Sequence, residues 1–453
     1  MKQKLLLLLL VAAYVIYTTV LLYLSPALAP YNQSFKGFFV VAFIMGVVLV
    51  VGIPFSGRPL DTDTKLVFLL YILFALYTLG LAFVSEEPVR AVIESGKYYM
   101  RIAFFFALVI WVNNLRDRAW VVGFPIVFGL AFAIQSLLLL GLLFAGAPLQ
   151  QREVYIFEAF GADYPSYGLL GLANSMDLSL RTPLSVRVQS FFIEPSKFAL
   201  FLIHPIFVAY GIYRVQRLRR FLVYAVVMLL AFLATWSLGG LVAFGGSVLV
   251  LAYFRFRRAI PLGLRWTVLV LSFVSLVLLG RAIFEFSLNY VPEDPTDKFA
   301  ARVPGFAQGV SFEERSRTDA VGLEIFLQHP FGLSLINAYD SRILDFGDLA
   351  SPNAALYNLV HTGLVGMLLQ ALIFWVVLTR FMIPQLRHEC LGRYVSVAAV
   401  GVWTHSLSYG TWLDLNFFYT WAVVIALRDE VWPPRLADER VPAAGAHAVR
   451  SEA

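Results

Sequence analysis

Long apolar runs constrain this chain more than any other feature of its sequence. Many of them reach the ~20 residues that a helix needs to cross the ~30 Å hydrocarbon core of a bilayer. Within lipid, every backbone polar group must be paired inside the structure, so runs of this length indicate helices. Strands of a membrane barrel would alternate apolar and polar residues, and these runs do not. The sequence therefore predicts an all-α, polytopic transmembrane protein.

The composition excludes several other classes of protein. Of the 453 residues, 60% are hydrophobic and 14% are charged, with a mean hydropathy of +0.76. A soluble protein of this length could not keep so little polar surface in water. The net charge of +6 does not indicate nucleic acid, because the basic residues lie in short loops between apolar runs. The single cysteine, Cys390, excludes an internal disulfide and a cysteine-cluster metal site.

We expect about twelve spans, and the first is not a cleaved signal peptide. Lys2 and Lys4 precede an apolar run, as in a signal peptide, but the run from Leu5 to Leu24 exceeds the usual 7–15 residues. We interpret it as a retained span. The expected spans are 4–24, 37–54, 65–84, 93–112, 120–145, 191–213, 220–236, 240–254, 264–286, 356–380, 394–409 and 412–428. Tight turns are expected at Ser237–Gly240 and Gly410–Thr411.

Basic residues predict the orientation of these spans. With the N-terminus in the cytoplasm, the short outer loops hold little basic charge beyond Lys36 and Arg90. The inner loops hold many more basic residues: Arg58, Lys65, Arg116, Arg118, Arg214, Arg217, Arg219, Arg220, Arg255, Arg257, Arg258, Arg265, Arg380, Arg387 and Arg393. This asymmetry follows the positive-inside rule and also places the C-terminus in the cytoplasm.

Two long loops remain, at 146–190 and 287–355, and both are expected outside. A short turn is enough to join two helices, so loops much longer than a turn usually carry function. The second is expected to contain a helix over Thr318–Gln328. Residues 1–428 would form one transmembrane domain, and the polar, Ala/Pro-rich segment 429–453 a disordered cytoplasmic tail.

The first candidate site closes the first long loop. It holds Arg187, then Glu194 and Pro195, then Lys197. Pro195 suits the first turn of a helix, where the helix dipole favours a nearby carboxylate such as Glu194. The alternative is a helix start with a capping carboxylate and an interfacial arginine.

The second candidate is the charged run that contains Arg315 and Arg317, before the expected loop helix. Arginine presents a planar fork of donors that matches phosphate oxygens and keeps its charge. A solvated charge run is the commoner meaning of such a string.

The third candidate begins at Asn353 and continues to His361, Gly363 and Gly366. An ionisable group such as His361, about two turns inside a span, is a functional candidate by default. A neutral, hydrogen-bonded histidine is the structural alternative. The two glycines would allow another helix to pack closely.

The fourth candidate is the set Glu94, Lys97 and Arg101, whose spacing places them on one helical face. A charge at bilayer depth costs at least ~2.5–3.5 kcal/mol, so these side chains should face a polar cavity or a partner. A Glu94–Lys97 ion pair with Arg101 reaching to the interface is the structural alternative. The sequence has no Gly-rich phosphate loop, no outer Asp-x-Asp and no His-Glu-x-x-His pattern, so neither a metal nor a cofactor is predicted.

Taken in order, these residues resemble the Wzy/WaaL superfamily of O-antigen polymerases and O-antigen ligases, over roughly residues 60–430. The likeness lies in the many spans, the large outer loop before the tenth span, and three local patterns. These patterns are Arg187 before Phe192-x-Glu194-Pro195-Ser196; Ser237-Leu-Gly239-Gly240; and Arg317 (or Arg315) followed by His329-Pro330-Phe331-Gly332, Asn353 and Gly363-Leu-Val-Gly366.

The resemblance implies a GT-C-like fold and a metal-independent, inverting glycosyltransferase that uses an undecaprenyl-diphosphate-linked donor. Arg187 and Arg315 or Arg317 would hold the diphosphate, with Lys197, Arg101 and Asn353 as further substrate-binding candidates. Glu194 or His361 would accept the proton of the acceptor hydroxyl, and the residues do not decide between them. The implied partners are lipid-linked oligosaccharide and membrane lipid, with a chain-length regulator protein as a candidate, and no nucleic acid.

Three functions remain as alternatives. Ligases commonly show His-Asn-x-x-Leu and Glu-x-Gly-Leu-Ile-Gly, whereas this chain has Pro352 and His361 at the histidine and glutamate positions. The form Phe192-x-Glu194-Pro195-Ser196 is more similar to polymerases, so we prefer polymerase over a ligase that acts on lipid A–core. A non-enzymatic flippase of lipid-linked oligosaccharide would need charge along a central path, and here the charge is concentrated on one side.

Overall fold

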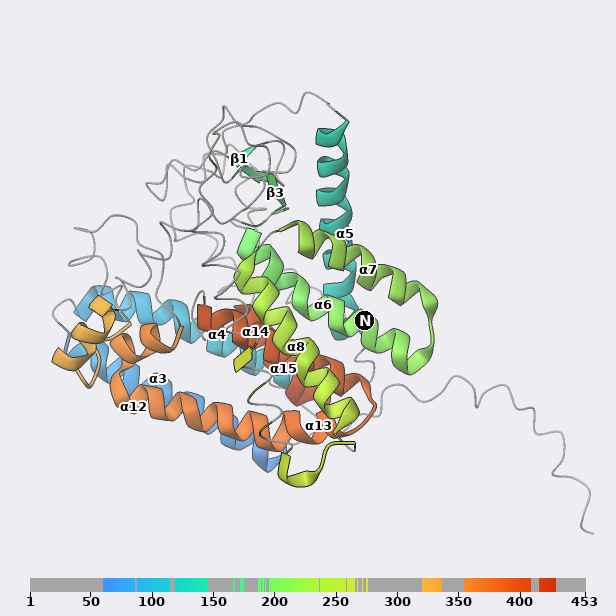
Figure 1. Cartoon of the computed structure of the whole chain (residues 1–453). Coiled ribbons are helices and arrows are strands. Elements are labelled where there is room, and N and C mark those ends of the chain that lie inside the picture. The colour runs from blue at the N-terminus through green and yellow to red at the C-terminus, as the bar shows by residue number, and fades with distance from the viewer. Residues whose placement is uncertain are drawn as a thin grey trace, which may run out of the picture.

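The computed structural model describes most of the expected membrane region (Figure 1). The described residues are 60–85, 88–114, 119–145, 166–167, 172–174, 186–188, 190, 192, 195–235, 237–257, 259–264, 267, 271, 274–275, 320–335, 354–408 and 415–428. The expected spans 4–24 and 37–54, most of 264–286, most of both long loops, the turn at Gly410–Thr411 and the tail 429–453 lie outside them.

Helices form wherever an expected span falls in the described residues. They are α3 (Thr62–Phe83), α4 (Pro88–Asn114), α5 (Ala119–Phe144), α6 (Pro195–Gln216), α7 (Arg219–Ala234), α8 (Leu238–Phe256), α12 (Ala354–Val376), α14 (Leu391–Ser408) and α15 (Leu415–Ala426). A π-helical turn, η8 (Val377–Met382), and α13 (Ile383–Arg387) continue α12, and η5 (Leu262–Leu264) is a 3-10 turn.

Six of these helices are long and apolar enough to cross a membrane, within the part of the chain described here. They are α3, α4, α5, α6, α8 and the continuous run from α12 to α13. The predicted class, a helical protein with several helices suited to crossing a membrane, is therefore confirmed. The figure of about twelve spans stays a prediction, since α7 has 16 residues and α15 has 12.

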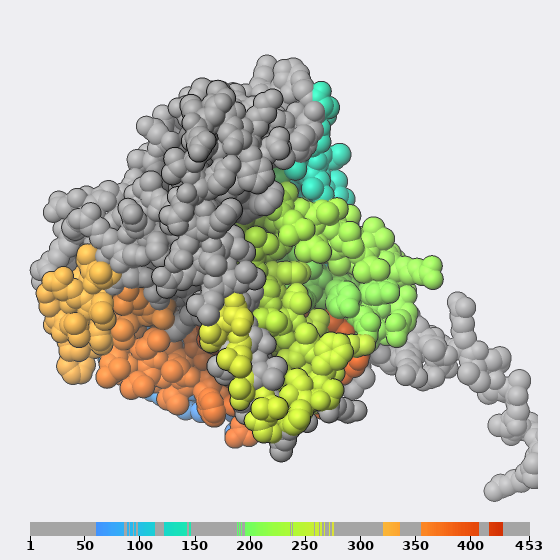
Figure 2. Space-filling view, in the orientation of Figure 1, coloured from blue at the N-terminus to red at the C-terminus, as the bar shows by residue number. Residues whose placement is uncertain are grey.

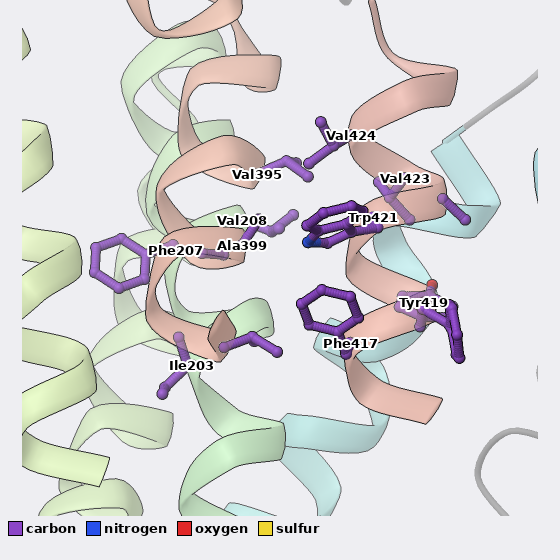
Figure 3. Close-up of a cluster of buried hydrophobic side chains, with 14 of the residues drawn as sticks. Ile203, Phe207, Val208, Val395, Ala399, Phe417, Tyr419, Trp421, Val423 and Val424 are labelled. Carbon is purple, nitrogen blue, oxygen red and sulfur yellow. The ribbon is translucent and has the colours of Figure 1, made fainter. Parts of the chain in front are cut away.

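The centre of the bundle is built by α6, α14 and α15. α14 packs against α6, α8 and α15, and α15 packs against α4. Figure 3 shows Phe207 and Val208 of α6, Ala399 of α14, and Phe417 and Trp421 of α15 in this buried cluster. Outside the centre, α3 lies along α12, and α5 and α7 pack together (Figure 1). Aromatic side chains thus fill the spaces between helices.

Small residues let the central helices approach closely. A Cβ atom at Gly401 of α14 would lie 2.8 Å from Cγ2 of Ile203 in α6, and one at Gly240 of α8 would lie 2.8 Å from Cβ of Ala199. Gly240 follows Ser237, whose side chain accepts a hydrogen bond from the Gly240 N–H at 3.2 Å and caps α8. The tight turn predicted at Ser237–Gly240 is therefore present.

Charged residues tie several helix ends together at one end of the bundle. Arg428, after α15, pairs with Asp61 at 3.3 Å and with Asp63 at 2.7 Å, at the start of α3. At the end of α6, Arg214 pairs with Glu389 at 3.3 Å. The Arg428 guanidinium also lies 5.1 Å from the ring centre of Phe381 in η8, which continues into α13. All these segments were predicted to share the cytoplasmic side, and they do share one end.

The first long loop contributes a small sheet, and its strands are the only ones among the described residues. Strands β1 (Ser166–Tyr167), β2 (Leu172–Asn174) and β3 (Val186–Val188) pair antiparallel in the order β1-β2-β3. Arg187 of β3 lies opposite Ala173 of β2. Extended loop backbone outside a helix must pair its polar groups in some other way, and strand pairing does so here.

Candidate functional site

Helix α12 is broken at Gly363, inside the span that the sequence predicts as continuous. Gly363 has a φ of 61° and a ψ of −169°, which no helical residue adopts. Across this break, Nε2 of Gln370 donates to Oδ1 of Asn358 at 3.3 Å. Residues twelve positions apart in a straight helix are separated by about 18 Å, so the segment 354–362 is folded back toward the segment that follows Gly363. An apolar helical run is present where a span was predicted over 356–380, and the break at Gly363 is a feature that the prediction did not include.

A segment of the second long loop fills the break. Residues 320–328 are helical, which confirms most of the loop helix predicted over Thr318–Gln328. The chain after this helix exchanges backbone hydrogen bonds with α12: the Leu364 N–H donates to the Pro330 carbonyl at 2.9 Å, and the Leu333 N–H donates to the Val360 carbonyl at 3.1 Å. A helix break inside a membrane would leave backbone N–H and C=O groups unpaired. The hydrogen bonds from this segment pair two of those groups and so stabilise the break.

Two glycines face each other where the segment meets the break. A Cβ atom at Gly363 would collide with the carbonyl group of Phe331, and one at Gly332 would lie 2.6 Å from the Gly363 nitrogen. Gly332 also has a positive φ, 93°. The sequence predicted that Gly363 and Gly366 admit a neighbouring helix. At Gly363 the neighbour is instead the backbone of the outer loop, because the positive φ ends the helix there.

His361 lies directly beside the break and is fully buried. Its Nδ1 is 2.8 Å from the Ser334 carbonyl oxygen. A carbonyl oxygen can only accept, so Nδ1 carries the proton and Nε2 is the basic nitrogen of the neutral ring. Ser334 has a φ of 77°, a left-handed conformation that costs a non-glycine residue about 1–2 kcal/mol. The histidine therefore fixes a strained turn of the outer loop.

Two tyrosines connect His361 to Arg101. The Tyr357 ring lies 4.2 Å from the His361 ring, centre to centre, and its hydroxyl is 2.7 Å from the hydroxyl of Tyr98 on α4. The Arg101 guanidinium lies 5.0 Å from the centre of the Tyr98 ring, within range of a cation–π interaction. Arg101, Tyr98, Tyr357, His361 and Ser334 are named here the break network.

The break network unites two of the predicted site residues, Arg101 and His361, which are 260 positions apart in the sequence. The sequence analysis missed both tyrosines. A helical-spacing signal was present, since Tyr98 precedes Arg101 by three residues and Tyr357 precedes His361 by four. Neither spacing indicates that the two tyrosines meet, because that contact depends on the fold.

Further polar side chains surround the break network at the same depth. Thr362 donates to the Asn358 carbonyl at 2.7 Å, and both side chains are fully buried. On α3, the Tyr77 hydroxyl donates to the Phe331 carbonyl at 2.7 Å, and Oγ1 of Thr78 lies 3.0 Å from the Tyr99 hydroxyl. This concentration of polar groups inside a membrane-type bundle marks the region as a functional candidate.

The first candidate site is anchored between α5 and α6. Phe192, which is buried, stacks on Phe198 in the first turns of α6 at a centroid distance of 5.3 Å. Oγ of Ser190 donates to Oε1 of Gln135 on α5 at 2.9 Å. These contacts hold the chain that follows β3, and with it the backbone of Arg187. Pro195 begins α6 as predicted, and Lys197 lies partly buried in its first turn.

Other predicted residues lie where the structure gives no side chain. Glu194, Arg315, Arg317 and Asn353 fall outside the described residues, and the side chains of Arg187, Glu94 and Lys97 are likewise not described. Their roles stay predictions. Among the residues with described side chains, no three His, Cys, Asp or Glu groups gather as metal ligands would. The expectation of a metal-independent reaction also stays a prediction.

The sequence matches no protein family model and no curated protein. The fold itself defines a class: an α-helical protein with several helices suited to crossing a membrane. The site adds a helix break, closed by the segment 329–335 and lined by buried polar groups.

Proposed function

We propose that this chain is a polysaccharide polymerase similar to the O-antigen polymerases of the Wzy/WaaL superfamily. It has about twelve spans and a GT-C-like arrangement in a bacterial inner membrane, with both termini in the cytoplasm and the site facing the periplasm. The donor is a growing glycan on undecaprenyl diphosphate, and the acceptor is a fresh repeat unit on the same lipid. The product is a lengthened lipid-linked glycan.

The observation that supports this proposal best is the break network. It gathers Arg101, at the middle of α4, with two tyrosines and a histidine beside the described segment of the second long loop. The network therefore joins a cation inside a helix suited to crossing a membrane to a loop segment. A transferase that acts on a lipid headgroup needs such groups connected to a loop on one side, whereas a flippase needs them along a path through the whole membrane.

The proposed reaction is a single displacement with inversion. A sugar hydroxyl of the acceptor attacks the anomeric carbon of the donor, and the bond from that carbon to the diphosphate oxygen breaks. The electron pair leaves with the lipid diphosphate, and the hydroxyl proton passes to a base. Negative charge grows on the diphosphate in the transition state, and positioned cationic donors stabilise it by roughly 3–4 kcal/mol each.

Arginines take the role that a metal has in many other transferases. Arg187 and Arg317 (or Arg315) would bind the diphosphate with their planar forks, and Arg101, Lys197 and Asn353 would complete the substrate site. Glu194 is the preferred base. His361 is fully buried, with Nδ1 held by Ser334, so its first effect would be to position the outer loop that carries the arginines.

The arginines provide the direct test of this proposal. In a host that lacks the native gene, we expect Arg187→Ala and Arg317→Ala to abolish long-chain polymer at normal expression. Lysine should rescue each only in part, because it lacks the bidentate fork. The chain-length ladder of the surface polysaccharide measures this outcome.

Arg219→Ala is the matched control, since Arg219 is exposed at the opposite, predicted cytoplasmic end and should leave the ladder intact. Full-length polymer from both arginine variants would refute the diphosphate role. Loss of long-chain polymer in Arg315→Ala but not in Arg317→Ala would assign the diphosphate role to Arg315.

A further inference from the structure

The segment 320–335 has an apolar surface that the bundle does not cover. Its sixteen residues include one charged residue, Glu324. Ile325 of its helix is buried against the protein, whereas Leu323, Leu327 and Phe331 are 50%, 70% and 69% exposed. In Figure 2 this segment lies at the edge of the molecule beside α12. Two exposed leucines of the helix and the exposed Phe331 that follows it therefore form the uncovered apolar surface of the segment.

The helix over residues 320–328 has three distinct faces. Successive residues are about 100° apart around a helix, so Leu323 and Leu327 lie within about 40° of each other. Gly322 and Ile325 form the buried face, and the exposed Glu324 and Gln328 form a polar face, with Nε2 of Gln328 3.5 Å from Oε1 of Glu324. A helix with one face on protein, one apolar and one polar suits the boundary between lipid and water.

The depth of the segment comes from its hydrogen bond to α3. The Phe331 carbonyl accepts from the hydroxyl of Tyr77, which lies six residues before the last residue of α3. That separation is about 9 Å along the helix axis. Helical side chains lean toward the helix N-terminus, so the contact is no shallower than Tyr77 itself. Beyond this level, α3 continues with exposed Phe83 and Val84, so the apolar surface of the bundle extends past Phe331.

The exposed apolar side chains of the segment continue the outer apolar surface of its neighbours. α3 and α12 pack along each other, and their outward residues are also large and apolar, namely Leu69, Leu73 and Leu76 on α3 and Leu364, Leu368 and Leu372 on α12. On a membrane-crossing bundle such a surface faces acyl chains. Leu323, Leu327 and Phe331 extend it onto the outer loop.

We propose that the segment 320–335 is re-entrant: it enters the outer leaflet and places Leu323, Leu327 and Phe331 in contact with lipid acyl chains. The helix of the segment lies at the interface with Glu324 and Gln328 toward water, and Phe331 reaches deepest. The lipid surface is thus a binding partner of the second long loop. This surface is independent of the reaction assigned to the chain.

Fluorescence quenching at two adjacent positions tests the proposal. In a Cys390→Ser background, which has no other cysteine, Leu327→Cys and Gln328→Cys are each labelled with an environment-sensitive fluorophore. The labelled proteins are placed in phospholipid nanodiscs, where both membrane faces are accessible. A nitroxide-bearing phospholipid should quench the label at 327 several-fold more than the label at 328, and aqueous iodide should quench in the reverse order.

Leu69→Cys on α3 is the lipid-facing reference, and its strong quenching by the nitroxide lipid confirms that each preparation is folded and inserted. Equal iodide quenching at 327 and 328 would show that the apolar face points to water and would overturn the proposal. Protection of 327 from both quenchers would show that protein covers it, which would equally overturn the proposal.

Discussion

At the scale of single residues, the break network joins groups from three parts of the sequence through few contacts. The hydrogen bond between the hydroxyls of Tyr98 and Tyr357, at 2.7 Å, is the link between α4 and the short segment of α12. Arg101 lies against one of these rings and His361 against the other. Two uncharged phenol groups thus take part in positioning the cation relative to the second long loop.

Removing either hydroxyl should loosen this link. We expect Tyr98→Phe and Tyr357→Phe each to lower the free energy of unfolding by about 1 kcal/mol, the usual net value of such a bond, and to reduce turnover. The double variant should cost about as much as one single variant, because both remove the same interaction. Thermal unfolding in detergent measures the coupling, and strictly additive losses would show that the two hydroxyls do not interact.

The base of the proposed reaction is decided at the same scale. A true base loses rate without losing donor binding, since it acts mainly in the transition state. We expect Glu194→Gln to bind lipid diphosphate normally and to lose most of the ~10²–10⁴-fold contribution of a general base. His361→Ala should have the smaller effect on single-turnover rate at saturating donor. The opposite ranking would assign the base to His361 and leave Glu194 as a helix cap.

At the scale of elements, the helices were predictable and the break was not. Hydropathy locates α3, α6 and α12 because each buries its own backbone polar groups, a property of local sequence. The break at Gly363 depends on a positive φ and on a segment thirty residues earlier in the chain that pairs with the freed backbone. This pairing is a tertiary contact, which local sequence does not reveal. The sequence therefore placed His361 inside an unbroken span.

Gly363→Ala tests the break directly. An added Cβ would collide with the Phe331 carbonyl group, and the backbone conformation, which is almost exclusive to glycine, would alone cost about 1–3 kcal/mol. We expect a clear loss of thermal stability in detergent and loss of activity. Gly80→Ala on α3 is the matched control: nothing lies within 4 Å of its added Cβ, and alanine favours a helix by roughly 0.5–1 kcal/mol. Equal melting temperatures for the two variants would contradict the account of the break.

At the scale of the whole molecule, the ion pairs show which helix ends lie together. Arg428, Asp61, Asp63, Arg214 and Glu389 gather at one end, and these residues come from segments predicted to share the cytoplasm. The break network lies farther along the bundle, between the middle of α4 and the loop segment that contacts α3 at Tyr77. The loop basic residues thus predict which helix ends come together. They could not reveal the polar groups between the helices, because those belong to apolar spans.

The central claim is that this chain lengthens a lipid-linked glycan, and one reconstitution tests it most directly. Cells without the gene should accumulate its own substrate, a single repeat unit on lipid diphosphate, which can be extracted and given to the purified protein in nanodiscs with EDTA. The account predicts a ladder of products, each longer by one repeat, with free lipid diphosphate released and no dependence on added Mg²⁺ or Mn²⁺. Unchanged single repeats after incubation with folded protein, or elongation that requires a divalent metal, would contradict it.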